Sequence, residues 1–188
     1  KFMDGMAQQR EEAMQLQRQA TRSLQHEPSM YSAASLERRY ALRHEPRVVE
    51  ELRLWWLAAQ TLGPDARGLS PSEYQLIFLL VYKAMIDEFS LAEATQAVHE
   101  DWLNDARGRA LLSASGFMDC LFELADVWTS TTDAEEYSEF LHRLLLNVTF
   151  VDEQGTRRFK LQESVVAGSG QPNSLEEQLE RGLSAQER

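Results

Sequence analysis

The residues with the clearest potential for chemistry lie in a charged loop that begins at Asp105. A calcium-binding loop of about twelve residues needs oxygen ligands at its first, third, fifth and last positions and a glycine at its sixth. In a loop from Asp105 to Gly116, only the first position carries a carboxylate. Arg107 and Arg109 occupy the third and fifth positions, and Ala110 replaces the glycine. Two cations stand where ligands are required, so the pattern predicts that this loop does not hold calcium.

Other side chains do not form a catalytic or metal-binding pattern. The histidines lack the spacing of metal ligands; they are His26, His44, His99 and His142. Cys120 has no Lys, Arg or His in its own helical turn to lower the pKa of its thiol, and we expect a small buried apolar residue there. We therefore predict no enzyme activity, no cofactor, no metal and no small-molecule substrate. An enzyme with dispersed acidic residues stays open as a third class.

Composition limits the class of partner. With 188 residues and a hydrophobic content of 43%, the chain can form one domain with a core and an appendage. A formal net charge of -11 disfavours binding to nucleic acid and to anionic membranes, because both require clustered Lys and Arg. No apolar run approaches the roughly 18 residues of a membrane span. A single cysteine excludes an internal disulfide, so we expect a cytoplasmic protein.

Helical spacing of apolar residues predicts the elements that would position the charged loop. A helix over 47–61 ends at Gly63 and Pro64. Serine or threonine with glutamate three residues later predicts a capped helix start at three further places, Ser70–Glu73, Ser90–Glu93 and Thr132–Glu135. Ser113 caps another helix. The helix after Ser70 is apolar on nearly all sides, and we expect it at the centre of the core.

The two ends of the chain follow different patterns. Residues 5–25 predict a helix with a thin apolar stripe, either solvated or docked on a partner, and a short helix follows over 33–43. A β-hairpin is predicted around Gly155, and residues 167–173 read as a flexible linker. The predicted organisation is an N-terminal helical arm over 1–45, a helical domain with a terminal hairpin over 46–163, and a flexible acidic tail over 164–188.

The two helix-loop-helix units, about forty residues apart, share structural positions although their ligand positions are lost. Leu112 and Ser113 lie where paired calcium loops carry an apolar residue and a helix cap, and Leu69 and Ser70 take the same places in the first unit. Residues 47–129 therefore resemble a degenerate EF-hand pair. The resemblance implies a mainly α fold, with a tandem EF-hand-like helix-loop-helix pair, an extra packed helix and a short C-terminal β-hairpin.

We expect the protein to bind other proteins as a structural or adaptor subunit. The segments HEDW, LFELADVWT and YSEFLHRLL resemble proteins of cilia and flagella, which implies a cytoskeletal assembly as the partner. The predicted partner contacts are Trp55, Trp56, Leu16 and Leu24. Adjacent tryptophans point about 100° apart on a helix, so one is expected at a partner interface; burial of both is the alternative. A calcium-responsive sensor with a residual or atypical metal site is the second functional hypothesis.

Overall fold

The structure is a computed structural model that describes residues 33–63, 67–129 and 131–171. This part of the chain is mainly helical and carries one antiparallel hairpin, which confirms the predicted fold class. The predicted helix over 5–25, with Leu16 and Leu24, lies outside the described residues, as does most of the predicted tail. The elements are α2 Ala33–Leu42, α3 Pro46–Ala59, α4 Pro71–Met85, α5 Leu91–Ala106, α6 Ala114–Trp128, α7 Ala134–Val148, β1 Thr149–Val151, β2 Arg157–Phe159 and the 3-10 turn η2 Gln162–Ser164.

Side-chain caps fix where the central helices begin. At the start of α4, the Ser70 backbone amide donates to Glu73 Oε2 at 2.7 Å, and the Glu73 amide donates back to Ser70 Oγ at 3.4 Å. This reciprocal pair satisfies two amides that a helix start leaves without partners. Ser113 caps α6 in the predicted way. The cap of α7 differs from the prediction, because Asp133 rather than Thr132 accepts the hydrogen bond from the first turn.

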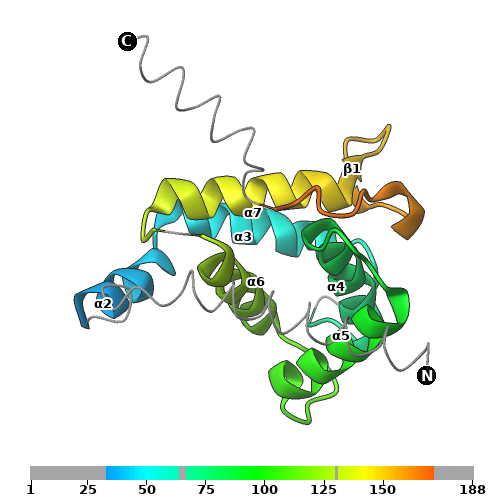
Figure 1. The fold of residues 1–188 in the computed structure, drawn as a ribbon, viewed down its shortest axis with the longest axis horizontal. Helices are drawn as coiled ribbons and strands as arrows, with labels where there is room; N and C mark the ends of the chain where they lie inside the picture. The colour runs from blue at the N-terminus through cyan, green and yellow to red at the C-terminus, as the bar shows by residue number, and fades with distance from the viewer. Residues whose placement is uncertain (1–32, 64–66, 130, 172–188) are drawn as a thin grey trace, which may run out of the picture.

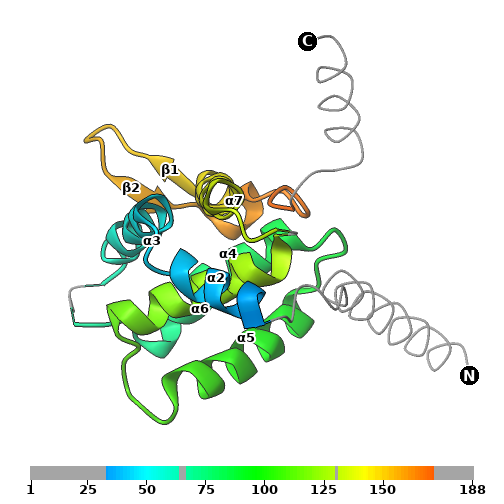
Figure 2. The same ribbon diagram turned by 90° about the vertical axis from the view of Figure 1, so that its left-hand side faces the viewer.

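The helices form two layers. Figure 1 shows α7 lying along α3 in one layer, with α4, α5 and α6 on the other side of the molecule. Figure 2 shows α3 and α7 end-on with the hairpin above them, and α2 crossing α6. Fully buried side chains from both layers meet between them, among them Ile77, Phe117 and Leu144. The second layer, α4 to α6, holds the cavity described below.

Two backbone hydrogen bonds join the loops that precede α4 and α6. The Leu69 amide donates to the Leu112 carbonyl at 2.8 Å, and the Leu112 amide donates to the Leu69 carbonyl at 2.9 Å. Both leucine side chains are buried. Gly68 is needed at this contact, because a Cβ there would lie 2.6 Å from the Leu112 carbonyl oxygen. The two residues singled out as equivalent in the sequence therefore pair directly.

The short helix α2, which lies within the predicted arm over 1–45, packs on the helical domain. Leu42 is buried in the core. Arg39 lies 3.3 Å from Asp126 and Arg43 lies 2.5 Å from Asp119, so α2 runs opposite in direction to α6. The end of the predicted arm is thus held by the buried Leu42 side chain and by ion pairs to an acidic face of α6.

The segment after the hairpin also packs on the domain, where the sequence predicted a flexible tail from residue 164 and a linker over 167–173. We call residues 165–171 the C-terminal strap. Gly168 and Gly170 donate their amides to the carbonyls of Lys83 and Ala84, at 3.1 Å and 2.7 Å, and the Gln171 side chain donates to the Met85 carbonyl at 2.9 Å. The strap therefore caps the last turn of α4, whose carbonyls have no partner within the helix.

A side chain at position 170 should detach the strap. A Cβ on Gly170 would lie 2.7 Å from Leu144 Cδ1 and 3.2 Å from the Ala84 carbonyl oxygen. We expect Gly170→Val to lower the free energy of unfolding by about 1–3 kcal/mol, as overpacking does elsewhere. Urea denaturation measures the change, with Ser164→Ala at an exposed position as the control. Equal stability of Gly170→Val and the unchanged protein would contradict the capping role.

Candidate functional site

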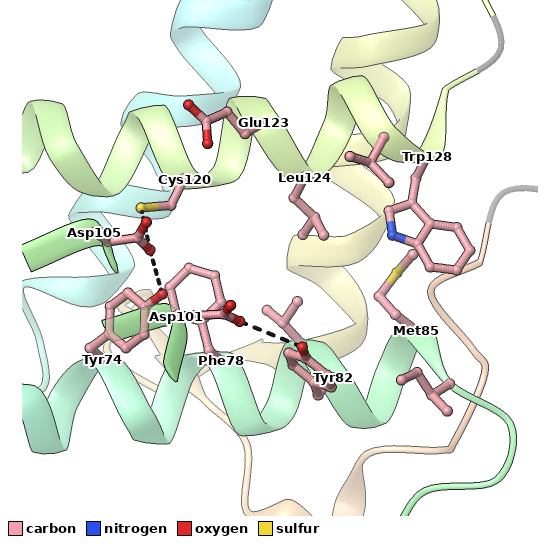
Figure 3. A pocket seen from close by; sticks show the side chains of 13 residues that line it. Tyr74, Phe78, Tyr82, Met85, Asp101, Asp105, Cys120, Glu123, Leu124 and Trp128 are labelled. Carbon is pink, nitrogen blue, oxygen red and sulfur yellow. Dashed lines mark hydrogen bonds between the residues drawn. The ribbon is translucent and has the colours of Figure 1, made fainter. Parts of the chain in front are cut away.

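A cavity of about 350 Å³ opens between α4, α5 and α6. Figure 3 shows side chains from α4 on one wall and from α6 on the other, with two aspartates of α5 between them. Such a volume lies near the lower end for ligand pockets and is large enough for one or two side chains of another molecule. The candidate site therefore lies among side chains of the three helices and not in the predicted calcium-loop positions.

Aromatic and aliphatic side chains make up most of the lining. The Tyr74 ring stacks on Phe78 with a centroid separation of 4.2 Å and meets Trp102 edge-on at 5.3 Å. These aromatic contacts hold the Tyr74 and Phe78 rings in place in the cavity wall. Met85 and Trp128 lie at the other end (Figure 3), and Leu124 extends the apolar surface along α6. The C-terminal strap supports that end, because it caps the turn that carries Met85.

Three carboxylates line the same cavity: Asp101 and Asp105 from consecutive turns of α5, and Glu123 from α6. The Tyr74 hydroxyl donates to Asp105 Oδ2 at 2.6 Å. The Tyr82 hydroxyl lies 3.5 Å from Asp101 Oδ2, which is at the limit of a hydrogen bond. The cavity is thus lined mostly by apolar side chains and carries negative charge.

Burial changes the acidity of these groups. Desolvation raises the pKa of Asp101, and the negative charge of Asp105 raises it further. Desolvation, followed by the hydrogen bond to Asp105, also raises the pKa of Tyr74 far above its ordinary value, so its hydroxyl stays protonated and keeps donating. These shifts mark a partly dehydrated negative site in which a positive group would be stabilised.

Cys120 lies in the wall of the cavity and is only partly buried, whereas the sequence predicted a small buried apolar residue. Its Sγ lies 3.1 Å from Asp105 Oδ2 and 3.1 Å from the Gly116 carbonyl oxygen. A single thiol proton can be donated to one of them at a time. Burial and the hydrogen bond to Asp105 raise the pKa of the thiol, so the group is a weak nucleophile at neutral pH, as the sequence predicted.

The charged loop is organised differently from a calcium loop. Asp105 belongs to the last turn of α5, and its carboxylate faces the cavity rather than the loop. Arg109 donates from its guanidinium to the carbonyls of Ala106 and Asp105, at 2.9 Å and 3.1 Å, and so caps the C-terminus of α5. Arg107 ends that helix in the left-handed conformation. Within the described residues, no three His, Cys, Asp or Glu side chains come together in a way that could hold a metal ion.

The two predicted partner contacts that the structure describes, Trp55 and Trp56, do not line this cavity. Trp55 is 0% exposed, and its indole nitrogen donates to the Leu141 carbonyl at 3.0 Å. In this conformation the core uses both the apolar surface and the donor of Trp55. Trp56 is partly buried and lies 6.1 Å from the Phe117 ring, between centroids. Leu16 and Leu24 lie outside the described residues.

Sequence reasoning missed the acidic lining of the cavity. Asp101 and Asp105 are four residues apart, which places both on one side of α5. Tyr74 and Tyr82 are eight residues apart on one side of α4. Both spacings are visible in the sequence. Because Asp105 was assigned to the loop, it was not recognised as lying on the same face of the helix as Asp101.

Comparison of the chain with family models, with curated proteins and with solved structures finds no match. Among the helices that the structure describes, none combines the length and apolar character that crossing a membrane requires. The site must therefore be interpreted from its own geometry and charge.

Cys120 provides a chemical probe of this geometry. A raised pKa leaves less thiolate at a given pH, so we expect Cys120 to react with a disulfide reagent at pH 8 more slowly than a free thiol does. The rate should rise with pH and reach half of its maximum above the pH found for a free thiol. Asp105→Asn should speed the reaction, because it removes the adjacent negative charge and lowers the thiol pKa.

The control for this measurement is Asp119→Asn on α6, outside the cavity lining; its charge also raises the pKa of the thiol but makes no hydrogen bond to it, so the rate should rise less than in Asp105→Asn. The rates of the three proteins are compared by stopped-flow absorbance across pH. If Asp105→Asn and Asp119→Asn have the same effect, the coupling between Cys120 and Asp105 is not specific.

Proposed function

We propose that this protein is a non-catalytic adaptor that binds another protein, and that the cavity between α4, α5 and α6 receives an apolar side chain of that partner. One observation carries the proposal: an open cavity of about 350 Å³ with walls of aromatic and aliphatic side chains. Open apolar surface of this kind, bordered by polar groups, is typical of sites where proteins bind each other.

The size of the cavity limits what it contributes alone. Burying one leucine or phenylalanine side chain yields about 1.5–3 kcal/mol, which is too little for a stable complex after the cost of association. The partner must therefore also contact the rim, where α6 exposes part of Val127. The cavity supplies the central anchor and the rim supplies the remaining area.

The proposed setting is the cytoskeleton of cilia or flagella. Its support is the sequence resemblance of the segments HEDW and LFELADVWT, which cover residues 99–102 and 121–129. These segments contribute Asp101, Leu124, Val127 and Trp128 to the cavity lining. Proteins that bind the same type of partner are expected to share the residues that line the binding cavity.

Capture of partners by matched surface variants tests the proposal. Val127 lines the cavity and Leu103 does not, yet both are exposed leucine or valine side chains on neighbouring helices. We expect Val127→Glu to reduce capture of specific partners from the source cells at least about tenfold, because a buried unpaired charge opposes docking. Leu103→Glu should change capture little. Quantitative mass spectrometry of the captured proteins measures both.

Equal capture by the unchanged protein and Val127→Glu would remove the cavity from the interface. Circular dichroism of both variants confirms that they are folded before the comparison is made. Recovery of axonemal components among the lost partners would support the ciliary setting, and their absence would contradict it.

A further inference from the structure

We propose that the cavity selects a partner segment that presents a lysine or arginine beside its apolar side chain, and that Asp101 and Asp105 receive the positive charge. The inference rests on the proposed function and names the chemistry of the partner. It comes from the juxtaposition of an apolar cavity with two carboxylates, Asp101 and Asp105, that form no ion pair with a basic side chain of the described residues.

The lining contains three carboxylates and no lysine, arginine or histidine. Asp101 and Asp105 lie one helical turn apart, so a single cation between them can interact with both. Neutral hydroxyls of Tyr74 and Tyr82 donate to them instead of a cation. Two carboxylates in a partly dehydrated site repel each other, and that repulsion is relieved when a cation binds.

On the opposite face of α6, carboxylates are paired with arginines of the same chain. There α2 lays Arg39 against Asp126 and Arg43 against Asp119, and the Arg43 guanidinium lies 4.9 Å from the Phe122 ring centroid. Arginine beside apolar surface thus matches one acidic face of α6 within the chain. On the cavity side, Glu123 lies 3.4 Å from Arg43, but Asp101 and Asp105 have no matching arginine among the described residues.

Neighbouring cations are committed to other contacts. Arg109 donates to carbonyls at the end of α5, and the Lys83 ammonium donates to the Gln162 carbonyl at 2.8 Å. Arg43 pairs with Asp119 and lies 3.4 Å from Glu123 at the rim. Moving any of these three into the cavity would leave a helix end or another carboxylate without its partner, which favours a cation supplied by another molecule.

The remaining segments of this chain fit the cavity less well than an external partner does. Residues 172–188 carry four glutamates and two arginines, so they share the charge of the cavity. In the helix predicted over 5–25, Arg18 and Arg22 fall on the side opposite Leu16 and Leu24. Docking that stripe would turn both arginines away from the aspartates. We therefore assign the cavity to a separate protein.

Binding of two designed helical peptides to the full chain tests the assignment. Both peptides carry leucines at the same helical spacing, and they differ in having lysine or glutamine between them. We expect the leucine-lysine peptide to bind at least about tenfold more tightly, as a hydrogen-bonded charge would provide. Amide shifts of Tyr82, Leu124 and Val127 in NMR titrations would place the peptide in the cavity.

Matched variants separate this site from general attraction to an acidic protein. Asp101→Asn combined with Asp105→Asn should reduce the preference for lysine to about twofold or less. Glu100→Gln, paired with Glu139→Gln, removes the same total charge from exposed positions outside the lining and should retain the preference. Thermal unfolding of each variant shows whether it is folded.

The outcomes distinguish the inference from the function on which it rests. Equal binding of both peptides in the cavity would overturn the cation selectivity and leave the docking function standing. Absence of cavity shifts with either peptide would overturn both. Equal losses in the two pairs of variants would show general charge attraction and overturn the inference. Tighter peptide binding after Leu16→Glu and Leu24→Glu would assign the cavity to the arm of this chain and overturn it as well.

Discussion

The pair of backbone hydrogen bonds between Leu69 and Leu112 sets the geometry on which the rest of the domain depends. Each leucine is followed directly by a capping serine and then by a helix, so joining the loops fixes where α4 and α6 start relative to each other. The energy involved is small, about 0.5–1.5 kcal/mol for each bond. Leaving the buried amides without partners would cost more, about 1–3 kcal/mol each. The contact therefore acts mainly as a constraint on position, and the cavity lies between the two helices that it aligns.

Electrostatics divides α6 into two acidic faces with different uses. Toward α2, Asp126 accepts a hydrogen bond from the Tyr137 hydroxyl and pairs with Arg39, so a single carboxylate connects α2, α6 and α7. Toward α5, Glu123 joins Asp101 and Asp105 around an apolar space. Partly exposed pairs such as those of α2 contribute little to stability, typically less than about 1 kcal/mol each. They hold Arg39 and Arg43 beside α6, where Arg43 reaches Glu123 while Asp101 and Asp105 form no ion pair with a described basic side chain.

The sequence predicted what local signals encode. Serine caps, proline at the first helical position and apolar spacing located the helices, and Gly155 located the hairpin, because these signals act within a few residues of the element they specify. It did not predict contacts between distant segments. The strap on α4, the hydrogen bond from Trp55 to Leu141 and the aspartates that meet Tyr74 and Tyr82 all depend on how helices cross. The tetrapeptide Asp-Ala-Arg-Gly illustrates the difference, since Gly68 allows close backbone approach and Gly108 provides a positive φ in open space.

The C-terminal strap has a consequence for how the chain is made. The carbonyls at the end of α4 receive donors that lie up to 86 residues further along, so this helix end is incomplete while the intervening chain is being synthesised. Closing a loop of that length in an unfolded chain costs about 4 kcal/mol of entropy. Folding of α5, α6 and α7 first would shorten the effective loop and lower that cost. The cap on the Met85 carbonyl, at the far end of the cavity, can therefore form only after almost the whole domain has left the ribosome.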